Sequence, residues 1–284
     1  MLREVKVLDQ GFVRLITWMP FNMVEIAEFL QGVTTYPNDP VAGEIPEVTS
    51  NDLAVVNAAR VSFNKESLML SKADRRLIAF LAEHGHSSPA RHTMVTMEVQ
   101  APMMVARQWF KYVVGSVHTQ DSFELLGLGN GDDSSMIDPM YARNESSRRY
   151  VTEEPLFHLP EPGTWRSAPE NRKQGSGGPV DSDFDLNLTR TLKIVQGIGR
   201  DHYEWALKEG VCAEQARLYL PAYSMYLHWR WSASLVGICH FLNQRLGEGA
   251  QVEINAYAHA VYDLVCQPEV YPVTAKEMLK DVTE

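Results

Sequence analysis

The sequence predicts an α+β fold: a single domain in which a mixed, mainly antiparallel sheet is flanked by helices and the C-terminal half is helical. Two patterns predict it. Alternating apolar residues, the period of strands, occur early in the chain and end at Ala101. After Leu186 the apolar residues follow the helical period almost throughout. No repeat at a fixed period is visible, and we interpret residues 1–284 as one domain.

The first elements follow from alternation and from helix-breaking residues. Alternating apolar residues on both sides of Gln10-Gly11 predict a hairpin. A short helix-like stretch, Met23 to Leu30, precedes a Pro-rich loop over 34–50. We expect a helix from Asp52 to Val61. A second helix should begin after Ser71, which forms a capping box with Asp74, and should end at Gly85.

The later elements are mainly helical. Val95 to Ala101 alternates as a strand with one buried face, and Pro102 then opens a helix that runs to Lys111. Gly- and Pro-rich composition predicts loops over 116–144 and 160–182. A helical stripe begins at Leu186 and ends at Gly210. The stretch 224–246 is apolar on most sides, which predicts a central helix.

Composition excludes several classes of protein. There are 26 basic and 36 acidic side chains, so the net charge of −10 disfavours a nucleic-acid partner, and a phosphate-bearing ligand requires a local basic pocket. The cysteines Cys212, Cys239 and Cys266 form no CxxC pair, which favours a reducing, cytoplasmic location. No apolar run of 18 residues and no signal-peptide pattern is visible, so we expect no membrane association.

Three groups of residues could carry chemistry. His84, His86 and His92 lie close in sequence, but without nearby carboxylates or a zinc-binding spacing they predict no metal site; cap and core roles are the alternative. The segment 144–150 sets hydroxyl groups beside arginines, as a phosphate monoester site or a solvated charged turn would.

The third group is Arg217 and Arg245, which lie in otherwise apolar helices. A buried guanidinium needs either an acidic partner or a bound anion, and nearby glutamates could supply ordinary ion pairs. No GxSxG, P-loop or GxGxxG motif is present. The residues themselves therefore lead to an internal anion pocket and no further.

Seven blocks, in order, resemble the flavin-dependent thymidylate synthases. They include Asn57-Ala58-Ala59-Arg60-Val61-Ser62-Phe63 and Ala216-Arg217-Leu218-Tyr219-Leu220-Pro221, and together they span residues 7–13, 57–63, 85–92, 101–110, 144–150, 216–221 and 240–254. The stretches of about 18–50 and 117–143 look like insertions. The resemblance implies reductive methylation of dUMP to dTMP with methylenetetrahydrofolate, in which FAD passes a hydride from NADPH.

The resemblance also implies roles for individual residues. The nucleotide would be held by Gln108, Ser147, Arg149, Arg217 and Arg245. Arg217 would reach in from a neighbouring subunit of a homotetramer, and Arg245 would contact the pyrimidine ring. The flavin would meet Ser62, Ser88, Lys111, Asn144, Glu145 and His240, with His86 and Tyr150 lining the same cavity. We expect Arg245 and His86 to be catalytic, and no cysteine to act as a nucleophile.

The chain departs from the family pattern around the flavin. The family's Arg-His-Arg signature reads Lys111-Tyr112-Val113 here, and three residues stand where the family commonly has Asn, Arg and His: Ser234, Val236 and Gly249. We therefore expect FAD to bind more weakly than in the family. Two alternatives remain open: a pyrimidine nucleotide hydroxymethylase on the same scaffold, and a nucleotide-binding paralogue without catalysis.

Overall fold

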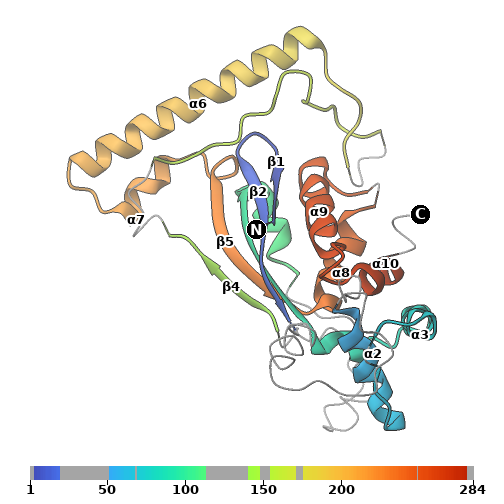
Figure 1. The fold of residues 1–284 in the computed structure, drawn as a ribbon. Helices are drawn as coiled ribbons and strands as arrows, with labels where there is room; N and C mark the ends of the chain where they lie inside the picture. Colours follow the sequence, from blue (N-terminus) through green and yellow to red (C-terminus); the bar gives the residue numbers. More distant parts are fainter. Residues whose placement is uncertain are drawn as a thin grey trace, which may run out of the picture.

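The computed structural model describes residues 3–19, 51–67, 69–112, 140–147, 154–170, 175–247 and 249–279. The expected helix over 23–30 and the expected loop over 34–50 lie outside the described residues. The described part is a sheet covered by helices on one side, with one long helix set apart from it (Figure 1).

The sheet has five strands in the order β1-β2-β3-β5-β4, and every described pair is antiparallel. The strands are β1 (Arg3–Val7), β2 (Gly11–Met19), β3 (Met94–Pro102), β4 (Ala142–Glu145) and β5 (Tyr226–Ala233). The predicted hairpin is confirmed as β1 and β2. Its turn holds Leu8 in the left-handed region at φ 56°.

The helices are mainly C-terminal, which confirms the α+β class. They are α2 (Asp52–Arg60), α3 (Lys72–Glu83), α4 (Met103–Trp109), α6 (Ser182–Lys208), α7 (Ala213–Ala216), α8 (Leu235–Arg245), α9 (Val252–Val265) and α10 (Pro272–Met278). Short 3-10 turns are η1 (Val61–Phe63), η2 (Ser88–His92) and η3 (Arg217–Tyr219). The predicted capping box of Ser71 and Asp74 is present at the start of α3.

One face of the sheet carries the core. Alternate residues of β3 and β5, including Met97, Trp229 and Trp231, are buried against α4, α8 and α9. The Trp109 ring of α4 stacks on Phe241 of α8 at a centroid distance of 4.5 Å and meets Trp231 edge-on at 5.2 Å. The core therefore fixes α4 and α8 against each other, and both helices end in candidate site residues.

The prediction of one helix over 224–246 is wrong in its first half. Residues Tyr226–Ala233 form β5, and only Leu235–Arg245 is helical. In β5 the buried Trp229 and Trp231 alternate with the more exposed His228 and Arg230, which is the strand period. Two further boundaries differ: the expected loop over 116–144 ends in β4, and Trp18 of the expected insertion pairs with Val95 in the sheet.

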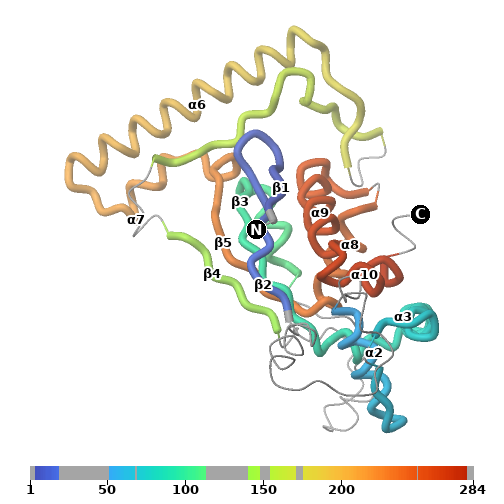
Figure 2. Tube along the Cα trace, viewed as in Figure 1, coloured from blue at the N-terminus to red at the C-terminus, as the bar shows by residue number. Residues whose placement is uncertain are grey.

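Helix α6 lies apart from the sheet, and segment 154–170 runs beside it (Figures 1 and 2). It exposes an unusual set of apolar side chains to solvent: Phe184, Leu186, Ile194, Val195, Ile198, Trp205 and Leu207. An exposed apolar surface of this kind is typical of a protein–protein contact.

Asp74 provides a test of the α3 start. Burial alone would raise the pKa of Asp74, but hydrogen bonds from Ser71, Arg60 and Ser67 lower the pKa from 3.8 to about 2. A lowered pKa adds stability that is present above about pH 4 and is lost as the pH falls toward 2. Asp74→Asn should therefore lower the free energy of unfolding by about 2 kcal/mol at pH 7. It should also reduce the amount of stability that is lost as the pH falls.

Urea unfolding of the two proteins between pH 2 and pH 7 measures both effects. Asp201→Asn, a change at an exposed position on α6, is the control and should leave the curve unchanged. If Asp74→Asn lost as much unfolding free energy between pH 7 and pH 2 as the wild type, the stabilising role of ionised Asp74 would be contradicted.

Candidate active site

Arg245 ends α8 in a defined position. Its guanidinium carbon lies 5.1 Å from the centre of the Tyr112 ring, which itself packs against Phe241 and His240 at centroid distances of 5.4 and 5.7 Å. Burial raises the pKa of Tyr112, and Arg245 opposes that shift. The buried Nε of Arg245 has no hydrogen-bond partner among the described residues. The result is a cation held against Tyr112, and a guanidinium in that position suits an oxygen acceptor on a ligand.

The start of α9 joins α4 and α8 next to this cation. Gln108 of α4 donates a hydrogen bond to the side chain of Gln251, and Gln251 donates to Glu253 at 2.7 Å. Asn255 donates to the carbonyl oxygens of Arg245 and Leu246 at 2.8 and 3.1 Å. Gln108 and Arg245, two of the predicted nucleotide residues, are thus both tied to the first turn of α9.

Glu253 is not the partner of Arg245. It pairs with Arg166, and no carboxylate of the described residues pairs with Arg245. The ion-pair alternative for Arg245 that the sequence left open therefore finds no support in the part of the chain that the structure describes.

Arg217 is placed differently from the sequence expectation. The prediction that it lies inside an apolar helix is wrong, because Arg217 is exposed in η3 and its Nε donates to the Glu214 carbonyl at 3.2 Å. Next to it, Leu218 is 83% exposed and Tyr223 is 68% exposed. η3 packs against α6, so Arg217 lies beside the helix that exposes the apolar side chains.

The expected flavin residues fall into two groups. Ser62 in η1 and Ser88 in η2 are exposed, and Lys111 is exposed beside the half-buried His240, whose pKa burial lowers. Helix α2, which leads into η1, packs against η2, and η2 packs against α8. The two turns therefore border the start of α8, where the Leu235 amide donates to Thr93 and Val236 packs on Ala90, whereas Arg245 lies at the other end of that helix.

Two further features of this region suit a bound aromatic ring. His86 is exposed in a stacked row with His84 and Phe80, at centroid distances of 6.3 and 6.1 Å. In η1, Val61 and Phe63 are 71% and 75% exposed. Uncovered aromatic and apolar side chains of this kind fit the planar ring of a flavin.

The second group lies on the edge strand β4. Asn144 and Glu145 are exposed there, and Ser147 follows the strand. Asn144 and Glu145 border an open cavity of about 400 Å³, and Ser147 does not line it. Arg143 borders the same cavity, and its guanidinium carbon lies 3.6 Å from the Phe110 ring centre. Three other residues lie outside the described residues: Arg149 and Tyr150 of this motif, and Val113, which stands where the family has the second arginine of Arg-His-Arg.

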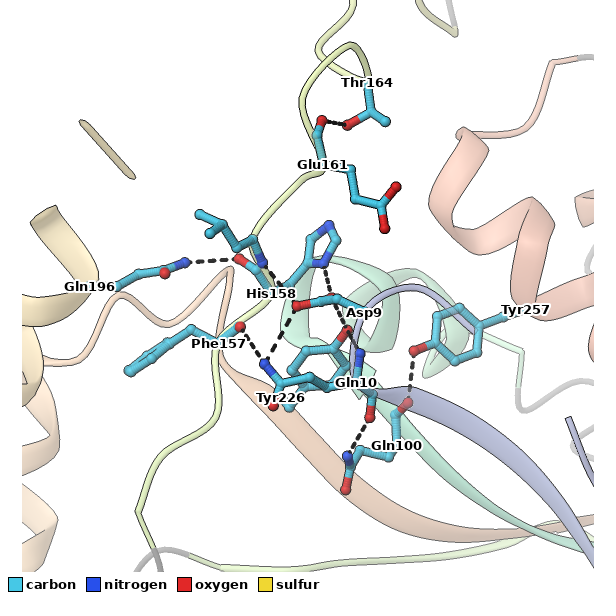
Figure 3. Close-up of polar contacts among 11 residues, drawn as sticks. Asp9, Gln10, Gln100, Phe157, His158, Glu161, Thr164, Gln196, Tyr226 and Tyr257 are labelled. Carbon is cyan, nitrogen blue, oxygen red and sulfur yellow. Dashed lines mark hydrogen bonds and ion pairs between the residues drawn. The ribbon is translucent and has the colours of Figure 1, made fainter. Parts of the chain in front are cut away.

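Sequence reasoning gave no role to a polar cluster around Asp9 (Figure 3). The Asp9 carboxylate accepts hydrogen bonds from His158 Nδ1 at 2.5 Å, from the Tyr226 hydroxyl at 2.7 Å and from the Leu159 amide at 3.3 Å. Burial alone would raise the pKa of Asp9, but these bonds lower it to about 2. An aspartate in a hairpin turn was the signal available in the sequence; nothing there pointed to its partners.

Two kinds of site find no support in the described ranges. No group of three or more His, Cys, Asp or Glu side chains there could hold a metal ion. None of the described helices is both long and apolar enough to cross a membrane.

Comparison with known proteins places the chain. Residues 45–272 match the family model of the Thymidylate synthase complementing protein, Thy1. A flavin-dependent thymidylate synthase of Thermus thermophilus is 31% identical over 92% of this chain and 73% of its own length. One of Thermosipho africanus is 28% identical over 98% and 94% of the two chains.

A solved structure supports the fold. The UMP/dUMP methylase PolB of Streptomyces cacaoi, bound with 5-Br UMP, superposes with a TM-score of 0.67 at 20% identity, covering 98% of this chain and 97% of the other. Because the family model spans well over half of the sequence, the chain belongs to the Thy1 family, that of the flavin-dependent thymidylate synthases.

Proposed function

We propose that the protein converts dUMP to dTMP by reductive methylation, taking the one-carbon unit from methylenetetrahydrofolate and a hydride from NADPH through FAD. The observation that carries this proposal is Arg245. Its guanidinium lies over Tyr112 and lacks an acidic partner among the described residues, and its buried Nε has no hydrogen-bond partner there. In a family whose relatives are named for thymidylate synthesis, such a group suits the pyrimidine of dUMP.

The chain's own residues would act by binding and by electrostatics. As carbon 5 of the uracil becomes nucleophilic, negative charge develops on the ring oxygens, and a cation already held in place stabilises that charge without reorganisation. Gln108 of α4 bonds Gln251 at the start of α9, the helix whose Asn255 bonds the Arg245 carbonyl oxygen, and Gln108 would orient the nucleotide. His240 favours the neutral form because burial lowers its pKa. Bound FAD would supply hydride chemistry that side chains lack.

The cysteines support a mechanism without a thiol nucleophile. Burial strongly raises the pKa of Cys239, and it raises the pKa of Cys266 to about 11, so neither forms a thiolate readily at neutral pH. Cys212 is exposed at the start of α7, whereas Arg245 ends a different helix, α8. Reduced flavin can deliver hydride without a covalent sulfur intermediate.

FAD is expected to bind more weakly than in the family. Lys111 offers one exposed cation where the family pattern has two arginines and a histidine, and each lost charge-assisted contact costs about 1.5–3 kcal/mol. Tyr112 does not compensate by stacking on the flavin, since its ring already contacts Arg245, His240 and Phe241. Its proposed role is to hold Arg245.

A reaction with dUMP, methylenetetrahydrofolate, FAD and NADPH, followed by mass analysis of the nucleotide, tests the proposed function. The proposal expects a gain of one methyl group that depends on all four components. A hydroxymethylated product would assign the hydroxymethylase alternative. Binding of dUMP without any turnover would assign the non-catalytic alternative.

A homotetramer is the proposed assembly, because Arg217 can serve a nucleotide only if its exposed surface meets another subunit. That surface combines η3 with the apolar side of α6, including Leu218 and Ile198. Ile198→Asp should reduce the particle mass measured by light scattering and should abolish turnover, because a charge is costly in a buried contact. Lys72→Gln, at an exposed position on α3, changes the net charge by the same single unit and should leave both unchanged. An active wild-type monomer would contradict the assembly.

Arg245→Ala should lower turnover by about 100-fold or more, the scale expected when one preorganised electrostatic contact is lost. Arg245→Lys should restore little, because an ammonium group cannot reproduce the planar fork of a guanidinium. Steady-state kinetics with dUMP measures both variants, and the thermal unfolding midpoint shows that they fold. Turnover near the wild-type value in Arg245→Ala would remove Arg245 from the reaction.

Two variants of Tyr112 distinguish the contribution of its ring from that of its hydroxyl group. Tyr112→Leu removes the aromatic face under Arg245, and a cation–π contact of about 0.5–2 kcal/mol predicts a loss in turnover of roughly 2- to 30-fold. Tyr112→Phe keeps the face but removes the hydroxyl group that interacts with Arg245, so its loss should be smaller than that of Tyr112→Leu. FAD affinity, followed by visible absorbance, should change little in both variants. A larger loss in Tyr112→Phe than in Tyr112→Leu would refute the role of the ring.

A further inference from the structure

A chain of side-chain hydrogen bonds runs from Arg166 to Gln108, one of the residues expected to hold the nucleotide. Arg166 Nη2 donates to Glu253 Oε1, and Gln251 Nε2 donates to the other carboxylate oxygen, Oε2, at 2.7 Å. Gln251 Oε1 in turn accepts from Gln108 Nε2. The chain thus joins the segment before α6, the start of α9 and helix α4.

The chemistry of Arg166 and Glu253 fixes the direction of every bond in this chain. An arginine side chain can only donate, and an ionised carboxylate can only accept. Burial alone would raise the pKa of Glu253, but hydrogen bonds from Arg166 and Gln251 lower it, so Glu253 is ionised at neutral pH. Gln251 must therefore turn its NH₂ group toward Glu253 and its carbonyl oxygen toward Gln108. Only the amide nitrogen of Gln108 can bond that oxygen.

The same direction determines what Gln108 can offer a ligand. Its amide nitrogen has two hydrogens, of which one goes to Gln251 and the other to the Met104 carbonyl oxygen at 3.3 Å. No described residue donates to Gln108 Oε1, and this oxygen is not one of the buried atoms without a partner. Gln108 therefore presents an accessible acceptor. Since phosphate oxygens also accept, this amide does not suit the phosphate of a nucleotide.

Arg166 is itself held in place by the fold. Its Nη1 donates to the Thr164 carbonyl oxygen at 3.2 Å, and the amide of the neighbouring Trp165 donates to Asp185 of α6 at 3.2 Å. Glu253 thus pairs with a cation whose position is set by another helix. A side chain that is already oriented loses little entropy when a ligand binds to it.

We propose that Arg166 and Glu253 are positioning residues that set the direction of this chain, so that the carbonyl oxygen of Gln108 accepts a hydrogen bond from the nucleotide. This proposal rests on the proposed function, which makes dUMP the ligand. Two groups of dUMP can donate: the N3–H of the uracil ring and the 3′-hydroxyl group of the sugar. The phosphate is then held by groups other than Gln108.

Glu253→Gln reverses the chain with little change in shape. Because Arg166 can only donate, the new amide must turn its oxygen to Arg166 and its NH₂ group to Gln251. The amides of Gln251 and Gln108 then turn over as well, and Gln108 presents its NH₂ group to the nucleotide. Loss of a negative charge would by itself strengthen the binding of anionic dUMP, whereas the reversal weakens it.

Two further variants accompany Glu253→Gln. Gln251→Met cuts the chain without changing a charge. Glu83→Gln, at an exposed position on α3, is the matched control for the loss of one carboxylate. The thermal unfolding midpoint shows which variants fold, and if Glu253→Gln does not, the comparison with Gln251→Met decides.

Calorimetry with the full-length protein and FAD measures the affinity for dUMP and for two analogues. One is 3-methyl-dUMP, which lacks the N3–H, and the other is 2′,3′-dideoxyuridine monophosphate, which lacks the 3′-hydroxyl group. In the wild type and in Glu83→Gln, at least one analogue should bind about tenfold more weakly than dUMP, the value of one hydrogen bond.

In Glu253→Gln, dUMP itself should bind about tenfold more weakly, and that analogue should no longer differ from dUMP. In Gln251→Met the difference between the two ligands should shrink. The analogue whose deficit disappears identifies the group that donates to Gln108.

A wild-type protein that binds both analogues as tightly as dUMP would overturn the proposal. So would a deficit that persists unchanged in Glu253→Gln and Gln251→Met, or tighter binding of dUMP by Glu253→Gln. These affinities do not depend on turnover, so bound dUMP without a methylated product would contradict the proposed function alone. No binding of dUMP by the wild type would contradict both.

Discussion

The carboxylate of Asp9 joins three parts of the chain that would otherwise have little reason to meet. It lies in the turn between β1 and β2, and it binds the hydroxyl of Tyr226 at the start of β5 and the ring of His158 in the segment that leads to α6. The pKa of about 2 means that this carboxylate stays ionised throughout the neutral range. Its bonds are therefore charge-assisted, which makes them stronger than bonds between neutral groups.

The Asp9 contacts also position residues of the candidate active site and of helix α6. Segment 158–166 borders a cavity of about 480 Å³. Its Arg166 pairs with Glu253, which accepts a hydrogen bond from Gln251, and Gln251 in turn accepts one from Gln108. On the other side the segment is bonded to α6, which carries the exposed apolar surface proposed for assembly. The packing of Trp109 between the sheet and α8 provides the second, apolar support of the Arg245 site.

Sequence patterns correctly predicted the elements that depend on neighbouring residues. The hairpin, the capping box at Ser71 and the strand ending near Ala101 were all predicted correctly, because each depends on residues a few positions apart. The prediction of a helix over β5 was wrong because residues 224–246 were treated as one apolar element. The alternation of Trp229 and Trp231 with His228 and Arg230 already carries the strand period. The Asp9 cluster could not be predicted, since its partners His158 and Tyr226 lie 149 and 217 positions away.

Hydrogen exchange in Asp9→Ala tests the central role of this carboxylate most directly. The amides of Leu159, Gly163 and Trp165 should exchange faster than in the wild type, while the amides of β3 serve as an internal reference and should keep their protection. Asp9→Asn, which retains an acceptor oxygen without the charge, should lie between the two. Unchanged exchange in segment 158–166, or an equal increase across β3, would contradict the view that Asp9 holds this segment and α6 to the sheet.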